Sequence, residues 1–134
     1  MTDDRFLSPQ GWPRAKGYAH GITTRGRLIF VAGQVGWNPT TERFETDDFA
    51  GQVDQALRNA MAVLREAVAE PGHIVRMNWY ITDKQAYLSS RLKIGEAYRN
   101  VLGKHFPAMT VVEVKSLMEE RAKVEIEVTA VVPE

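Results

Sequence analysis

The chain has 134 residues, of which 44% are hydrophobic and 25% are charged, as expected for one ordinary globular domain. Its 17 Lys and Arg balance its 17 Asp and Glu, so it lacks the positive excess typical of proteins that bind nucleic acids. It contains no Cys, which excludes disulfides, thiolate metal sites and a cysteine nucleophile. We expect a single domain over residues 1–134, without a cofactor or a metal.

No segment has the roughly 18 uninterrupted apolar residues that a membrane span requires. The first residues, MTDDRFLSPQGWPR, also lack the apolar core of a secretory signal. We therefore expect a cytoplasmic protein that does not contact membranes. A net charge near zero leaves little repulsion between copies, which favours self-association.

The first third of the chain predicts an arm, a hairpin and a loop. Residues 1–16 contain Pro9, Gly11 and Pro13 and are expected to form an irregular arm. Residues 27–35 (RLIFVAGQV) form a nearly continuous apolar run, typical of a strand that is buried on both faces. Residues 22–24 are expected to pair with that strand as a short hairpin. Residues 37–48 are polar and predict a loop.

The middle of the chain predicts a helix followed by a half-buried strand. Residues 49–69 carry apolar side chains at helical spacing, with Asp47 or Asp48 as the expected N-cap and Pro71 with Gly72 as the stop. Residues 75–82 alternate as in a strand. One face of that strand carries Val75, Met77, Trp79 and Ile81, and the other carries Arg76, Asn78 and Tyr80.

The last third predicts a second helix and two strands. Asp83 is expected to cap a helix over residues 84–103, in which Gly95 indicates a close backbone approach. Strands are expected over 109–117 and 122–132, and the last of them places alternate apolar residues on one face. Helices interleaved with strands predict an α+β protein, with a mixed sheet and two helices packed on one face. The mixed polarity of the other face favours assembly.

No phosphate-binding glycine loop, nucleophile elbow or zinc helix motif is present. Five short segments nevertheless occur in a distinctive order: GYAH at 17–20, FVAGQ at 30–34, QALRN at 55–59, FPAMT at 106–110 and VEIE at 124–127. Together they resemble the Rid family, also called YjgF, of reactive-intermediate deaminases. The resemblance implies a chorismate-mutase-like fold and a homotrimer with a small-molecule cleft between adjacent subunits. In the best-known members that cleft hydrolyses reactive 2-imino and enamino acids to 2-keto acids and ammonia.

The resemblance also implies a set of site residues. Glu125 falls at the position of the glutamate that positions the attacking water, so it is the expected catalytic residue. The expected substrate-binding residues are Tyr18, His20, Gly33, Met109 and Thr110. His20 stands where the deaminases usually have glutamine. Each of these residues also has an ordinary structural interpretation, as a surface ion pair, an interface ring, a packing glycine or a strand residue.

Met109 departs from the family pattern at the most informative position. The deaminases follow the Pro-Ala pair with an arginine that holds the substrate carboxylate, and here Pro107 and Ala108 are followed by Met109. A thioether has no charge and no donor, so it cannot bind a carboxylate. The chain therefore resembles an arginine-lacking branch of altered specificity, which favours a less anionic ligand. Three arginines are candidates to supply the missing cation from elsewhere: Arg76, Arg91 and Arg121.

Three functions follow as alternatives. The first is a hydrolytic imine or enamine deaminase of altered specificity, or a metabolite-binding protein without turnover, with its small-molecule ligand between subunits of a homotrimer. The second is an RNA-acting protein of the endoribonuclease or translation-inhibitor type, against which the neutral charge argues. The third is a stabilising or chaperone-like partner protein that uses the mixed-polarity face of the sheet.

Overall fold

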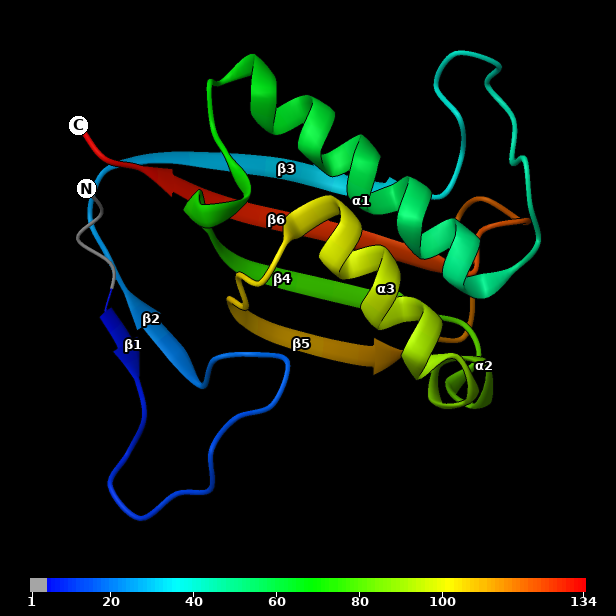
Figure 1. Ribbon diagram of the computed structural model, residues 1–134. Helices are drawn as coiled ribbons and strands as arrows, with labels where there is room; N and C mark the ends of the chain where they lie inside the picture. Colours follow the sequence, from blue (N-terminus) through cyan, green and yellow to red (C-terminus); the bar gives the residue numbers. More distant parts are fainter. Residues whose placement is uncertain (1–4) are drawn as a thin grey trace.

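A computed structural model of the chain describes residues 5–134 and contains a four-stranded sheet beside a small two-stranded ribbon (Figure 1). The larger sheet has the strand order β3-β6-β4-β5, in which β4 and β5 run parallel and the other neighbours antiparallel. Its strands are β3 Arg27–Val35, β4 Ile74–Ile81, β5 Ala108–Glu113 and β6 Val124–Val132. The ribbon pairs β1 Arg5–Leu7 with β2 Gly21–Thr23.

Two of the helices, α1 (Phe49–Glu66) and α3 (Arg91–Leu102), pack against each other over one face of the larger sheet (Figure 1). This arrangement confirms the predicted α+β class, with its mixed sheet and its helices on one face. The opposite face, which we call the open face, is covered by no helix of residues 5–134. Glu125, the expected catalytic residue, lies on this face.

The amphipathic stripe of α1 forms the centre of the core. Val53, Ala56, Leu57 and Leu64 are fully buried, as their spacing predicts. Asp48 begins the helix, because its side chain accepts a hydrogen bond of 2.9 Å from the backbone N–H of Gly51. The helix ends at Glu66, three residues before the predicted boundary. Val68 then adopts a left-handed φ of 56°, which the helix cannot continue through.

The predicted second helix is two helices. Asp83 caps α2 (Lys84–Ser89) as expected, by accepting hydrogen bonds from the backbone of Gln85 and Ala86. Ser90 has a ψ of 13° and separates α2 from α3. The expected close backbone approach at Gly95 is wrong, because the atoms nearest to an added Cβ belong to the Arg99 guanidinium, not to a backbone.

The inner face of the sheet follows the predicted alternation. Val124, Ile126, Val128 and Ala130 of β6 are at most 2% exposed and form the floor beneath the helices. In β4, Met77, Trp79 and Ile81 are buried as predicted, but Ile74 takes the place of Val75. The cause is a register shift between Ile74 and Arg76, which turns Val75 out of the inner row.

Several expectations near the ends of the chain are wrong. Residues 21–23 pair with β1, not with β3, so residues 5–7 of the predicted irregular arm form a strand; residues 1–4 of that arm lie outside the described residues. β3 is not buried on both faces, because the helices cover one side and Phe30 is 73% exposed on the other. The strand predicted over 109–117 ends at Glu113, and the last strand begins at Val124.

Candidate functional site

Four of the six predicted site residues line one small pocket beside the first residues of β5. Tyr18, His20, Met109 and Thr110 surround a space of about 250 Å³, which we call the β5 pocket. Arg76, from the neighbouring strand β4, lines it as well. The segment that carries Tyr18 and His20 is attached to β5 by a hydrogen bond of 2.9 Å from the Ala19 N–H to the Pro107 carbonyl. Residues 90 positions apart in the sequence therefore meet at this pocket.

His20 is held between two aromatic rings. Tyr18 and Trp12 both meet the imidazole edge to face, at centroid distances of 5.4 and 5.1 Å. The His20 Nε2 atom also lies 3.3 Å from the Pro13 carbonyl. These contacts fold residues 12–20 into one unit, so His20 has a structural role in shaping the pocket that it lines.

Met109 and Thr110 point to opposite faces of the sheet, as consecutive strand residues must. Met109 is partly buried and packs against the core on the helix side. Thr110 is exposed on the open face. Met109 therefore presents an apolar side chain to the β5 pocket.

The other two predicted residues, Gly33 and Glu125, meet on the open face. The Glu125 carboxylate lies so close to Gly33 that an added Cβ would overlap with it. A register shift between Val31 and Gln34 brings this part of β3 beside Glu125. The glycine therefore gives the carboxylate room, and Glu125 itself has no hydrogen-bond or ion-pair partner within residues 5–134.

The Gly33–Glu125 pair is too far from the β5 pocket for both to enclose one small molecule. Glu125 lies in register with Tyr80 of β4, and Tyr80 in register with Val112 of β5. Met109 is three residues along the strand from that row, or about 10 Å, and two strands across, or about another 10 Å. A site that uses all six predicted residues requires a second copy of the chain.

The sequence analysis missed a polar network on the open face. Glu127 accepts hydrogen bonds from the Tyr80 hydroxyl at 2.6 Å and from the Asn78 amide at 2.9 Å. These two donors lower the pKa of Glu127, and in return the Glu127 hydrogen bond raises the pKa of Tyr80. Arg76 extends the network through Asn78 at 3.5 Å. The alternation of residues 75–82 gave the signal, since it placed Arg76, Asn78 and Tyr80 on one face.

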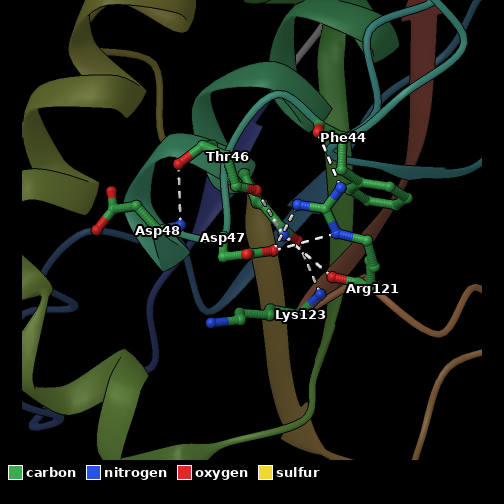
Figure 2. Close-up of polar contacts among 7 residues, drawn as sticks. Phe44, Thr46, Asp47, Asp48, Arg121 and Lys123 are labelled. Carbon is green, nitrogen blue, oxygen red and sulfur yellow. Dashed lines mark hydrogen bonds and ion pairs between the residues drawn. The ribbon is translucent and has the colours of Figure 1, made fainter.

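Of the three candidate arginines, Arg121 is occupied elsewhere. Its guanidinium binds the Asp47 carboxylate at 2.7 Å and the Phe44 carbonyl at 3.1 Å, and lies 5.7 Å from the Phe44 ring centroid (Figure 2). The Arg121 hydrogen bond and charge hold the pKa of Asp47 below its ordinary value. Arg76 lines the β5 pocket, and Arg91 lines a larger pocket described below.

The same region contains a buried amide that connects three backbone segments. The side chain of Gln52 is fully buried and donates to the carbonyls of Thr46 and Arg121, each at 3.1 Å. It also accepts a hydrogen bond of 2.8 Å from the Lys123 N–H. Gln52 thus connects α1 to the loop before it and to the segment that leads into β6. Strand β6 carries Glu125.

Residues 5–134 hold no group of three His, Cys, Asp or Glu side chains that could bind a metal ion. No helix in this part of the chain combines the length and the apolar character that crossing a membrane demands.

Comparisons with known proteins identify the family. Residues 12–132 match the family model described as endoribonuclease L-PSP. A RutC family protein from Aquifex aeolicus is 34% identical over 114 residues, which is 85% of this chain and 87% of that protein. The structure of the Rid-family protein YyfB from Yersinia pestis has a TM-score of 0.84 and 29% identity, and covers 97% of this chain and 99% of its own.

A 2-iminobutanoate/2-iminopropanoate deaminase from Dermatophagoides farinae is 26% identical over 132 residues, 98% of this chain and 99% of that protein. The sheet, the covering helices and these similarities together define an α+β protein of the YjgF fold. The chain belongs to the Rid (YjgF) family, as its five short motifs indicated.

Proposed function

We propose that the chain is a hydrolase of imines or enamines whose active site forms between two copies. Glu125 carries this proposal. It is the carboxylate of β6 that no described residue binds, whereas its neighbour Glu127 is held by Tyr80 and Asn78. It also lies against Gly33, which leaves the carboxylate accessible from the open face. A free carboxylate of this kind can accept a hydrogen bond from a water molecule and direct it.

The reaction requires little more than a positioned water. Glu125 accepts a proton from the water while the water oxygen forms a bond to the imine carbon, and that proton then passes to the nitrogen. The hydroxyl proton of the resulting carbinolamine also passes to the nitrogen, so the C–N bond breaks, ammonia leaves and the carbon keeps the oxygen as a carbonyl group. One imine and one water give one carbonyl compound and one ammonia, so no cofactor is needed.

A second copy supplies what one copy lacks. The open face carries Leu28 and Phe30, which are 58% and 73% exposed, beside the polar row of β6 and β4. Apolar side chains of this size on an otherwise uncovered sheet favour burial against another chain. Packing through this face brings the Gly33–Glu125 pair of one copy toward the β5 pocket of the next. We propose a homotrimer assembled in this way.

Met109 sets the specificity of the proposed site. It gives the β5 pocket an apolar wall where a carboxylate would otherwise be bound, and burying an unpaired carboxylate there is costly. The cation that lines this pocket is Arg76, on the adjacent strand. We therefore infer a preference for imines with apolar substituents over the small imino acids named for the deaminase relatives.

The test is ammonia release from three imines generated in the assay: those of alanine and leucine, which an amino acid oxidase forms, and that of benzylamine, which a flavin amine oxidase forms and which has no carboxylate. We expect a rate above buffer, highest for the benzylamine imine, that Glu125→Gln abolishes and Glu66→Gln, an exposed change at the end of α1, leaves intact. A wild-type rate equal to buffer with all three imines would contradict hydrolysis. It would favour the alternative of a binding protein without turnover, which shares the same pocket.

A further inference from the structure

A second pocket lies between α3 and the sheet, and the proposed hydrolysis does not use most of it. This α3 pocket has a volume of about 520 Å³, within the range of small-molecule sites. Five aromatic side chains line it: Tyr18, Trp79, Tyr87, Tyr98 and Phe106. Tyr98 and Phe106 stack with their rings 10° from parallel, and the Tyr98 hydroxyl donates to the His105 carbonyl at 2.6 Å. The aromatic wall is therefore fixed in place.

The charged side chains of the α3 pocket are all cationic. Lys16, Arg91 and Arg99 line it, and no Asp or Glu does. None of the three forms an ion pair with a residue from 5 to 134, although such pairs occur elsewhere at Arg58 and Arg121. Unpaired guanidinium groups beside an aromatic wall suit an anion with a planar apolar body. Arginine binds carboxylates in particular, through two parallel hydrogen bonds.

Gly95 creates the space between the two arginines. Residues 91, 95 and 99 are four apart and therefore follow one face of α3. All three line the pocket. An added Cβ at Gly95 would lie 3.3 Å from the Arg99 Nη1 atom, so this guanidinium lies over the glycine. Glycine costs about 1 kcal/mol relative to alanine inside a helix. Here the missing side chain keeps the pocket open.

A buried donor gives a second, independent indication of a ligand. Trp79 is 1% exposed, and its Nε1 atom has no hydrogen-bond partner among the described residues. Leaving a buried N–H unpaired costs about 1–3 kcal/mol. Because Trp79 lines the α3 pocket, the face of an aromatic ligand ring can accept this N–H as a weak hydrogen bond.

We propose that the α3 pocket binds an aromatic carboxylate, with its carboxylate held by Arg91 and Arg99 and its ring against the aromatic side chains that line the pocket. Tyr18 and Met109 line both this pocket and the β5 pocket, so the bound acid lies beside the proposed reaction site. The inference concerns binding and does not depend on catalysis by Glu125.

Calorimetric titration with two unreactive acids, 3-phenylpropionate and indole-3-acetate, tests this proposal. We expect each acid to bind at least tenfold more tightly than its neutral amide. Arg91→Gln and Arg99→Gln should each weaken binding of the acids about tenfold, whereas Arg65→Gln, an exposed change in the last turn of α1, should have no effect. Equal affinity for acid and amide, or unchanged binding by both arginine variants, would overturn the proposal.

Two further measurements separate binding from folding. Gly95→Leu fills the pocket while improving the helix propensity of α3, so binding should be lost without a lower melting temperature. The indole N–H resonance of Trp79, assigned with Trp79→Phe, should move when 3-phenylpropionate binds to the wild type. A Gly95→Leu protein that still binds the acids as tightly as the wild type would also overturn the proposal.

Discussion

The Tyr80 hydroxyl donates a hydrogen bond of 2.6 Å to Glu127, across the two central strands of the sheet. Together with Asn78, this donor occupies the Glu127 carboxylate and leaves Glu125, two residues earlier, as the available one. The two glutamates share a face and a strand and differ in what surrounds them. Glu125 is the better candidate for directing a water molecule because no described side chain occupies its carboxylate, although both residues are glutamates.

This relationship predicts a pH dependence. The pKa of Glu127 is lowered in the folded protein, first by the Tyr80 hydrogen bond and then by Asn78. Its stabilising effect is therefore complete above its ordinary pKa of 4.5 and is lost as the pH falls below that value, through the lowered pKa. Tyr80→Phe should raise the pKa of Glu127 toward its ordinary value, so acidification should remove less stability through this carboxylate, over a narrower pH range.

Titration of the glutamate carboxyl carbons by NMR checks this prediction. The resonance of Glu127 should shift its midpoint upward in Tyr80→Phe, whereas Tyr87→Phe, which removes a hydroxyl on the helix side of the sheet, should leave it unchanged. An identical Glu127 midpoint in the wild type and in Tyr80→Phe would show that the hydrogen bond does not set its pKa.

Gly33→Ala should remove hydrolysis without unfolding the chain. The new methyl group overlaps with the Glu125 carboxylate, and this partly exposed side chain can turn away more easily than the backbone can move. Ammonia release should fall at least tenfold, while the melting temperature changes little. Gly72→Ala is the matched control, because an added Cβ there meets nothing within 4 Å. Equal turnover by both variants would contradict the role of Glu125.

Gln52 should contribute more to stability than any exposed glutamine. Gln52→Met keeps the length of the side chain but removes its hydrogen bonds to Thr46, Arg121 and Lys123. Leaving these backbone groups unpaired should lower the free energy of unfolding by about 2–4 kcal/mol. Gln85→Met in α2, which is exposed, should stay within about 0.5 kcal/mol of the wild type.

Urea denaturation at one fixed protein concentration gives both values, since the stability of an oligomer depends on concentration. A Gln52→Met protein as stable as Gln85→Met would mean that water replaces the lost partners.

Local patterns predicted the parts of the fold that depend on neighbours in the sequence. The stripe of α1 and the alternation of β6 appear in the structure because one face of each element is buried in the core. The pairing of β1 with β2 had no such signal, since it joins two three-residue strands across a loop of 13 residues, 8–20. The exposed outer face of β3 was equally hidden, because an apolar run does not indicate what covers it.

The candidate site was likewise predicted only in part. The family motifs named Tyr18, His20, Met109 and Thr110, and these residues do meet at the β5 pocket. The motifs also identified Gly33 and Glu125. They did not indicate that these two residues lie apart from the other four within one chain. The ion pair of Arg121 with Asp47 joins residues 74 positions apart, and no spacing rule finds such a contact. The α3 pocket depends on a single glycine inside a helix, which the sequence showed but did not explain.

Phe30→Asp tests whether the open face joins the copies. A carboxylate in the middle of an apolar interface is costly to bury, so the variant should stay folded and become monomeric. Its mass in solution, measured by sedimentation or light scattering, should fall from that of three chains to that of one. Ammonia release should fall with it, because one chain does not bring Glu125 to the β5 pocket.

Met118→Asp is the control for this change. Met118 is 94% exposed, more than Phe30, but lies in the segment between β5 and β6 and not on the open face. We expect the Met118→Asp protein to keep the wild-type mass in solution and the wild-type rate of ammonia release. A Phe30→Asp protein that remains a trimer would place the interface elsewhere. A monomer with full activity would show that one copy suffices, and the proposed site between copies would be wrong.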